Sequence, residues 1–216
     1  MSIEASNISF SYEDRPIFND FNFSAENGQC TAVVGRNGAG KSTLLKLLVG
    51  ILRPTEGVIL LDEESLWRKR TFRKDRVRED HAALIGYVMQ KPERQLFAQT
   101  VFEDVAFGPK NLGLTENEIN ARVDKWLNYF GISNLADKSP YKISGGQQRM
   151  VAIAGVMAME TQNICFDEPS ASLDENGVST IHQLIDDLKQ QNRCVVLVSH
   201  DDAEVQKLAD RIVKIG

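Results

Sequence analysis

A glycine-rich loop constrains the fold of this chain more than any other feature. Residues 35–43, with the sequence GRNGAGKST, fit the pattern of a phosphate-binding loop. An apolar strand predicted at 29–34 precedes the loop, and a helix predicted at about 41–50 follows it. Glycines let the backbone curl so that its N–H groups point at phosphate oxygens, and the helix directs its positive end at the same anion. The loop therefore predicts a nucleotide site; a glycine-rich turn with an unrelated lysine is the alternative.

The polar side chains of the loop indicate what they bind. Lys41 brings a positive charge to the outer phosphates. The hydroxyl of Ser42 suits Mg²⁺, a hard cation that prefers oxygen ligands. The nucleotide-binding residues predicted here are Gly35, Asn37, Gly38, Gly40, Lys41, Ser42 and Thr43.

A pair of carboxylates follows a short apolar strand predicted at 164–166. Asp167 is predicted to hold Mg²⁺, directly or through water, and Glu168 to orient and deprotonate the attacking water. An exposed acidic turn is the alternative. Asn163 departs from the pattern, because a fully buried strand would prefer an apolar residue there.

A second candidate anion site lies at Ser144, Gly145, Gly146 and Gln147. Ser144 is predicted to cap the helix that follows, and the two glycines expose backbone N–H groups at its start. One nucleotide does not need two such sites on opposite sides. The pattern therefore predicts a dimer in which the second site of each chain closes on the nucleotide of the other, with a simple helix cap as the alternative.

Strands alternate with helices along the chain, which indicates an α/β core. A helical stretch at 101–159, with predicted interruptions at 108–109, Gly113, Gly131 and Pro140, divides this core and predicts an inserted subdomain at about 91–160. Thr115 and Glu118 are predicted to form a capping box. The further strands are predicted at 3–12, 17–25, 58–61, 82–89, 194–198 and 212–215, and a further helix at about 175–191.

The overall composition limits the classes of partner. The net charge of −5 and pI of about 5.3 give no basic footprint for nucleic acid, so no nucleic-acid partner is expected. No apolar run is long enough to span a membrane, and the N-terminus lacks the pattern of a signal peptide. Cys30, Cys165 and Cys194 lie in strand-like runs, which predicts buried reduced thiols and a cytoplasmic protein.

A charged stretch at 63–80 contains seven basic residues. We expect a solvated helix or loop face there, and contact with anionic lipid is the alternative. The basic residues are Arg68, Lys69, Arg70, Arg73, Lys74, Arg76 and Arg78.

Taken together, these motifs resemble those of the ABC ATPase family over essentially the whole chain. Residues 35–43 resemble its Walker A motif, 164–168 its Walker B motif and 143–147 its signature, with Ile143 where leucine is usual. The resemblance implies a P-loop ABC ATPase fold with a RecA-like core, an antiparallel β subdomain and the inserted helical subdomain, in a single domain of 1–216 that binds ATP and Mg²⁺.

The resemblance also assigns roles to isolated residues. Gln90 matches the Q-loop glutamine, expected near Mg²⁺ and the attacking water, and His200 matches the switch histidine, expected on the γ-phosphate. Asp174 ends a motif that resembles the D-loop, which crosses the dimer. Tyr12 matches the aromatic that stacks on adenine, with ordinary surface packing as the alternative. His81 and His182 match nothing and are expected to be structural.

The stretch at 95–114 is similar to that of energy-coupling-factor ATPases, which drive uptake of cobalt, nickel or vitamins. This implies a homodimer or a heterodimer with a related ATPase on the inner face of the cell membrane, together with a membrane coupling subunit and a substrate-binding membrane subunit. Leu96, Phe97, Val101 and Phe102 are expected to line a groove for the coupling subunit, or to form the subdomain core.

Further features of the sequence bear on which kind of ABC ATPase this chain resembles. The chain ends at Gly216, soon after its last strand, and we expect weak dimerisation without the membrane partner and greater similarity to metal-ion or biotin importers. The stretch between Lys41 and Ser144 is short and shows no sustained heptads, unlike DNA-repair members. A soluble ABC-type ATPase that acts as an ATP-dependent switch is the alternative to a transporter motor.

Overall fold

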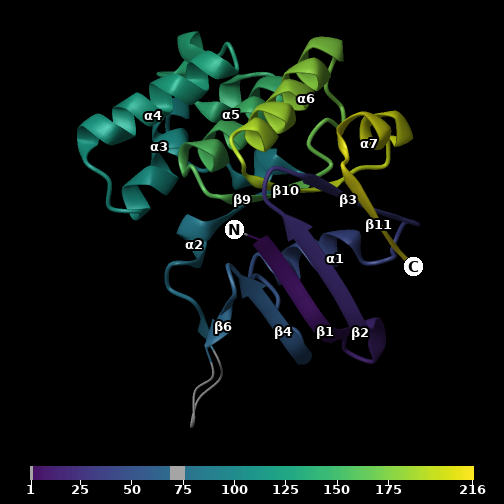
Figure 1. Cartoon of the computed structure of the whole chain (residues 1–216). Helices are drawn as coiled ribbons and strands as arrows, with labels where there is room; N and C mark the ends of the chain where they lie inside the picture. Colours follow the sequence, from purple (N-terminus) through teal and green to yellow (C-terminus); the bar gives the residue numbers. More distant parts are fainter. Residues whose placement is uncertain (1, 69–75) are drawn as a thin grey trace. The chain divides into compact units, whose positions relative to one another are not determined.

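The computed structural model describes residues 2–68 and 76–216 of the chain (Figure 1). The chain divides into two compact units. The first unit contains Met1–Tyr87, Gln162–Glu168 and His182–Gly216, and the second contains Val88–Thr161 and Pro169–Ile181. The helical insertion predicted at about 91–160 falls within the longer segment of the second unit, and the division into domains stays a prediction.

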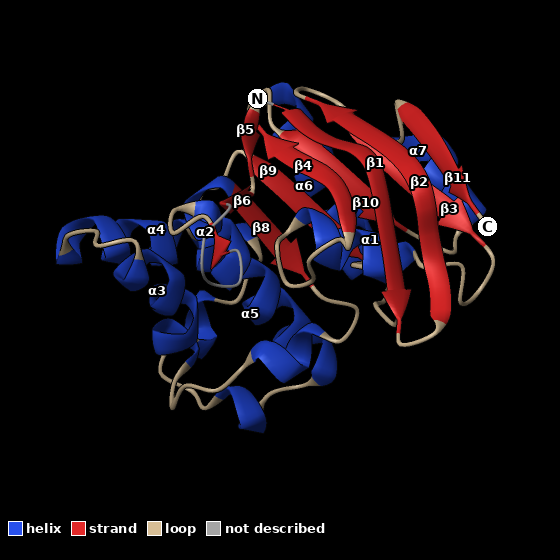
Figure 2. Cartoon of the chain, turned by 90° about the horizontal axis from the view of Figure 1, so that it is seen from below, coloured by secondary structure: helices blue, strands red, loops and turns tan. Residues whose placement is uncertain are grey.

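The first unit is built on two sheets. A four-stranded antiparallel sheet has the order β2-β1-β4-β5, and a five-stranded sheet has the order β11-β3-β10-β9-β8. Figure 2 shows the long strands β1 and β2 side by side. The bounds of the strands are Ser2–Tyr12 (β1), Arg15–Glu26 (β2), Cys30–Gly35 (β3), Glu56–Leu61 (β4), Glu64–Ser65 (β5), Ile85–Val88 (β8), Asn163–Asp167 (β9), Cys194–Val198 (β10) and Arg211–Ile215 (β11).

The strands β9 and β10 are buried along their whole length, which explains their continuous apolar sequences. They pair in parallel, and β3 pairs in parallel with both β10 and β11. Asn163, the polar exception in β9, is fully buried, and its Nδ2 atom donates a hydrogen bond to the Leu84 carbonyl at 3.0 Å. A buried amide is tolerated in this strand because it is hydrogen-bonded.

The three cysteines lie in strands, as predicted, namely β3, β9 and β10 of the five-stranded sheet. Cys30, Cys165 and Cys194 are all free and buried. Burial raises the pKa of Cys30 and of Cys194 to about 12. The reactive thiolate is therefore strongly disfavoured, and the thiols pack as small apolar groups.

Three helices form the body of the second unit, α3 (Val101–Asn111), α4 (Glu116–Tyr129) and α5 (Gly145–Ala158) (Figure 1). One short 3-10 helix precedes α3, at Pro92–Gln95, and two lie between α4 and α5, at Ser133–Leu135 and Pro140–Lys142. The capping box predicted at Thr115 and Glu118 is confirmed, and Thr100 with Glu103 forms another.

The structure corrects the prediction that Gly108 and Pro109 interrupt a helix. Helix α3 runs through both residues to Asn111. A Cβ atom at Gly108 would lie 2.6 Å from Cγ of Met159, so glycine lets α3 approach the end of α5 closely. Packing of this face outweighs the missing Pro109 N–H, because only one intrahelical hydrogen bond is lost.

The strand predicted at 82–89 is wrong in its first half. Residues His81–Leu84 form a short helix, α2, and only Ile85–Val88 are extended. Arg78 and Asp80 make two hydrogen bonds to each other, at 3.0 and 2.8 Å, and hold the turn in front of this helix.

The charged stretch at 63–80 is only partly as expected. Trp67–Arg68 (β6) and Arg76–Val77 (β7) pair as antiparallel strands, whereas Lys69, Arg70, Arg73 and Lys74 lie outside the described residues. Arg78 is buried rather than solvated, since it pairs with Asp80 at 2.8 Å and Glu64 at 3.2 Å. Arg78 is therefore a structural cation. Within 2–68 and 76–216, no helix is long and apolar enough to cross a membrane.

Candidate functional site

The predicted phosphate loop connects β3 to helix α1, Lys41–Leu48. Helix α1 packs by a fully buried face of four leucines, Leu44, Leu45, Leu47 and Leu48. Lys41 starts the helix, and its Nζ atom donates to the carbonyl oxygens of Gly35 at 2.8 Å and Arg36 at 3.1 Å. The ammonium group is thus held across the concave side of the loop, where a phosphate would bind.

The glycines at the two ends of this loop are required by close contacts. A Cβ atom at Gly35 would lie 2.2 Å from the Ile215 carbonyl oxygen, because β11 pairs with β3 at this position. Gly40 has a φ of 100°, and a Cβ atom there would lie 2.6 Å from Ile17. Asn37 and Gly38 between them are exposed, so the loop presents its backbone to solvent.

Replacement of Gly40 by alanine is expected to weaken ATP binding about tenfold, since it adds both backbone strain and a clash with Ile17 at the start of α1. A titration with ATP measures the effect. Gly113→Ala is the matched control, because Gly113 also has a positive φ, 77°, but no atom within 4 Å of the added Cβ. Equal ATP affinities in the two variants would contradict the prediction.

Asp167 ends strand β9 with one carboxylate oxygen held and the other unbonded. The Tyr87 hydroxyl donates to Oδ2 at 3.2 Å, whereas Oδ1 is buried and makes no hydrogen bond among the described residues. Burial raises the pKa of Asp167, and hydrogen bonds from the Ser42 and Tyr87 side chains oppose this rise. Burial and the nearby Asp167 raise the pKa of Tyr87, so its hydroxyl stays a donor.

This donor set fits Mg²⁺. The unbonded Oδ1 of Asp167 and the Ser42 hydroxyl are oxygen ligands, the kind that this cation prefers. The described residues contain no cluster of three or more His, Cys, Asp or Glu side chains that could enclose a metal ion. Two protein ligands suit a cation that is completed by water and by substrate phosphates rather than by a protein cage.

Glu168 and His200 form a close pair. His200 Nε2 lies 2.7 Å from Glu168 Oε1, and the His200 side chain is 46% exposed while that of Glu168 is 16% exposed. The two residues follow the neighbouring strands β9 and β10, whose carboxyl ends lie at one edge of the sheet. The Glu168 N–H donates to the Val198 carbonyl at 2.9 Å, which fixes the turn that carries the carboxylate.

The first unit therefore brings together five of the predicted residues, Lys41, Ser42, Asp167, Glu168 and His200. They lie at the carboxyl ends of β3, β9 and β10, the edge at which ligands bind in open α/β sheets. Thr43 is buried in α1 behind them. Tyr12 ends β1, is 44% exposed and packs edge-on against Phe10, so its role on adenine stays a prediction.

The remaining predicted residues belong to the second unit. Ser144 caps α5 as expected, in a capping box with Gln147, and Gly145 and Gly146 form the exposed first turn. The Asp174 carboxylate accepts a hydrogen bond from Gly177 N–H at 2.8 Å in the first turn of α6, Glu175–Gln190. The anion-binding and dimer roles of these residues stay predictions.

The backbone carbonyl of Gln90 accepts a hydrogen bond from Arg149, a residue that belongs to none of the predicted motifs. Arg149 is buried on α5 and donates to the carbonyl oxygens of Gln90 at 3.3 Å and Pro169 at 3.1 Å. The sequence predicted no role for Arg149 or for Tyr87. The signal available for each was a hydrogen-bonding group within an apolar segment, since such groups need a partner when buried.

The two histidines outside the motifs make structural contacts. His81 Nδ1 lies 2.8 Å from the Arg78 carbonyl oxygen. His182 on α6 lies 3.1 Å from Glu204 and 3.2 Å from Lys207, both on α7, Asp202–Leu208. These contacts fit the structural role expected of both histidines.

Comparison with known proteins decides the family. The family model described as ABC transporter matches residues 18–171, about 70% of the chain. This chain belongs to the ABC transporter family. The match begins in β2 and ends after β9, so it includes the segments that carry the phosphate loop, Ser144–Gln147 and Asp167–Glu168.

Relatives in the ABC transporter family extend the match to the whole chain. The energy-coupling factor transporter ATP-binding protein EcfA2 of Caldanaerobacter subterraneus is 40% identical over 99% of this chain and 75% of the relative. EcfA2 of Clostridium tetani is 41% identical with the same coverage. An ABC transporter ATP-binding protein of Bifidobacterium longum is 42% identical, and the chain spans 29% of its length.

A solved structure supports the ABC ATPase fold. The structure of cbiO1 from Clostridium perfringens, described as part of the ABC transporter complex cbiONQ, has a TM-score of 0.82 and 34% identity. The alignment covers 99% of this chain and 84% of cbiO1. The parallel sheet, the antiparallel sheet and the helical unit are the parts of the predicted fold class, which is thereby confirmed.

Proposed function

We propose that this chain is the ATP-hydrolysing motor subunit of an energy-coupling-factor importer, working at the inner face of the cell membrane. The observation that carries the chemistry is the Glu168–His200 pair at 2.7 Å, on the sheet edge that also carries Lys41 and Asp167. The EcfA2 relatives support the importer class. Cobalt, nickel or a vitamin is the proposed cargo.

Hydrolysis follows from the positions of these groups. ATP lies with its phosphates on the loop of residues 35–43, and Lys41 turns from its loop carbonyls toward the outer phosphates. Glu168 accepts a proton from the attacking water, and the water oxygen bonds to the γ-phosphorus. The bond from that phosphorus to the oxygen bridging the β- and γ-phosphates breaks, so that ADP leaves and inorganic phosphate forms. The His200 ring N–H donates a hydrogen bond to the γ-phosphate or to the Glu168 carboxylate. Either bond helps to hold the γ-phosphate and the base in position for attack by water.

The Ser42 hydroxyl and Asp167 Oδ1 are the proposed ligands of Mg²⁺, and the role of Gln90 near the ion is proposed from its sequence motif alone. When bound, the ion neutralises charge on the phosphate oxygens. The second nucleotide contact comes from another copy or a related ATPase, through Ser144 and Gly146 of the partner subunit. A capped helix start with exposed glycines suits this role, because free N–H groups there bind anions.

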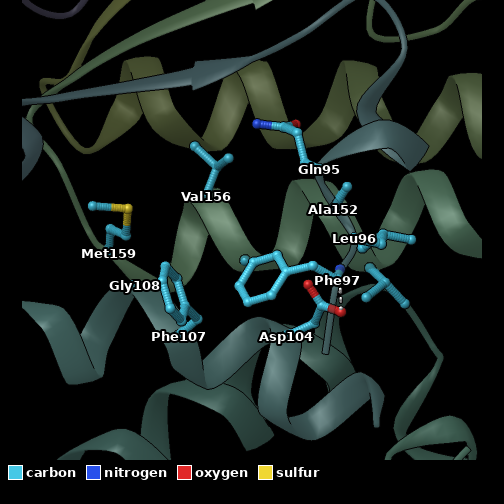
Figure 3. Close-up of a pocket in the computed structure, with 11 residues that line it drawn as sticks. Gln95, Leu96, Phe97, Asp104, Phe107, Gly108, Ala152, Val156 and Met159 are labelled. Carbon is cyan, nitrogen blue, oxygen red and sulfur yellow. Dashed lines mark hydrogen bonds between the residues drawn. The ribbon is translucent and has the colours of Figure 1, made fainter. Parts of the chain in front are cut away.

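A hollow on the second unit is the proposed docking site of the membrane coupling subunit (Figure 3). The cavity has a volume of about 140 Å³ between α3 and α5, and the rings of Phe97 and Phe107 meet edge to face at its mouth, 4.6 Å apart. The two rings are 56% and 45% exposed, large values for apolar groups. The Asp104 carboxylate accepts from Phe97 and Ala98 N–H and fixes the rim.

Only half of the expected groove residues line this hollow. Leu96 and Phe97 do, whereas Val101 is fully buried and belongs to the core of the second unit. Phe102 is not among the lining residues. Val101 lies on the face of α3 that packs into the core, whereas Leu96 and Phe97 precede the helix and line the hollow. The proposed groove for the coupling subunit therefore depends on Leu96 and Phe97 and not on Val101.

Affinity purification from detergent-solubilised native membranes tests the proposal. The tagged Glu168→Gln chain with ATP is expected to bring down a membrane coupling protein and a substrate-binding membrane protein. Phe107→Asp in the same chain should remove both, since a charge at the hollow opposes apolar docking, whereas Ile51→Asp, at a residue 57% exposed on the first unit, should not. Recovery of soluble partners alone would instead favour a soluble ABC-type switch.

A further inference from the structure

The Tyr87 hydroxyl contacts the proposed Mg²⁺ ligand Asp167, although Tyr87 belongs to none of the recognised motifs. Tyr87 is on β8, next to β9 in the sheet, and its Oη atom lies 3.2 Å from Asp167 Oδ2. Tyr87 is partly buried and is the last residue of the first unit. The contact therefore lies wholly within one unit.

The two oxygens of Asp167 are chemically equivalent until something distinguishes them. Tyr87 occupies Oδ2, and Oδ1 is left buried without a hydrogen bond from any residue that the structure describes. Rotation of the carboxylate would exchange the two oxygens and turn a hydrogen-bonded atom to the cation. The Ser42 hydroxyl also bonds to Asp167, but it is itself a proposed Mg²⁺ ligand. Tyr87 is the donor that remains on the carboxylate once Ser42 turns to the cation.

We propose that Tyr87 is a positioning residue that locks the Asp167 carboxylate with Oδ1 toward Mg²⁺. This rests on the proposed function, because it assumes that the site binds ATP with Mg²⁺. Its consequence is selective. Loss of the Tyr87 hydroxyl should weaken the response of nucleotide binding to Mg²⁺. The contacts of the phosphate loop with the nucleotide should stay intact, because Lys41 is held by the Gly35 and Arg36 carbonyls and the Tyr87 hydroxyl is bonded to Asp167.

The test is Tyr87→Phe in the Glu168→Gln chain, which removes one oxygen and keeps the ring. Binding of a fluorescent ATP analogue is measured against Mg²⁺ concentration. The concentration for half-maximal enhancement should rise about tenfold, while affinity for the analogue without Mg²⁺ stays within about twofold. Mn²⁺ with ATP, followed by electron paramagnetic resonance, should show the same loss of cation affinity. Tyr129→Phe, which removes a hydroxyl on α4, is the control and should change neither value.

Three results would overturn the inference. These are an unchanged Mg²⁺ response in folded Tyr87→Phe, an equal loss of nucleotide affinity with and without Mg²⁺, and an effect of the same size in Tyr129→Phe. Failure of the assumption that the site binds ATP with Mg²⁺ is distinguishable, because the chain without the tyrosine substitution would then bind no ATP. Failure of the importer role is distinguishable as well, because it would appear as loss of membrane partners with ATP binding intact.

Discussion

Glu168→Gln is expected to lower the ATP hydrolysis rate by about 10²–10⁴-fold while ATP binding is retained. The amide has the shape of the carboxylate and can still meet His200, whose Nε2 lies 2.7 Å away, but it cannot accept the proton of the attacking water. Steady-state phosphate release and an ATP titration on the same preparation separate the two effects. The substituted chain should also accumulate as a dimer with ATP, seen by gel filtration, because the closed state no longer turns over.

Glu63→Gln is a matched control for this substitution. Glu63 is an exposed glutamate with a φ of 66°, close to the 54° of Glu168, and it lies in the turn between β4 and β5. It should leave hydrolysis unchanged. A Glu168→Gln chain that retains more than about a tenth of the rate would show that another group serves as the base.

Lys41→Ala is expected to weaken ATP binding by about 10- to 100-fold, the range for loss of a charged hydrogen-bonding partner. Alanine removes the positive charge that Lys41 holds across the loop through the Gly35 and Arg36 carbonyls. Equilibrium ATP binding measures the change, and a thermal melt without nucleotide shows whether the loop itself has lost structure.

Lys214→Ala serves as the comparison for Lys41→Ala, because Lys214 is exposed on β11 and takes no part in the site. Its ATP affinity should match that of the unsubstituted chain. If Lys41→Ala bound ATP normally and lost only hydrolysis, the assigned role in ground-state phosphate binding would be wrong, and the charge would act on the transition state alone.

The positions of the proposed catalytic residues in the first unit could be predicted from the sequence, because the constraints on them are local. A strand that must be buried on both faces, such as β9 or β10, has a continuous apolar sequence, and polar residues directly after it lie at the sheet edge. The parallel pairing of β9 and β10 then brings Glu168 next to His200. The capped starts of α4 and α5 were equally local, since each depends on residues three apart.

The features that could not be predicted depend on residues distant in sequence. Helix α3 passes through Pro109 because Gly108 fits against Met159, and nothing near position 108 records that contact. Arg78 is buried through Glu64 and Asp80, in a stretch whose composition favours exposure. The position of Tyr87 matters because its hydroxyl contacts Asp167, 80 residues later in the chain. A single sequence does not predict this contact, because it does not give the order of strands in a sheet.

The backbone conformation of Glu168 lowers the stability of the folded chain, although the proposed chemistry needs a carboxylate at this position. Its φ of 54° lies in the left-handed region, which costs a residue with a side chain about 1–2 kcal/mol and costs glycine almost nothing. Glycine at position 168 would raise the free energy of unfolding, but the chain would lack the carboxylate that is proposed to activate water. Selection for heat resistance alone would therefore favour glycine at position 168, and a thermostable form of the ATPase has to gain its stability elsewhere in the chain.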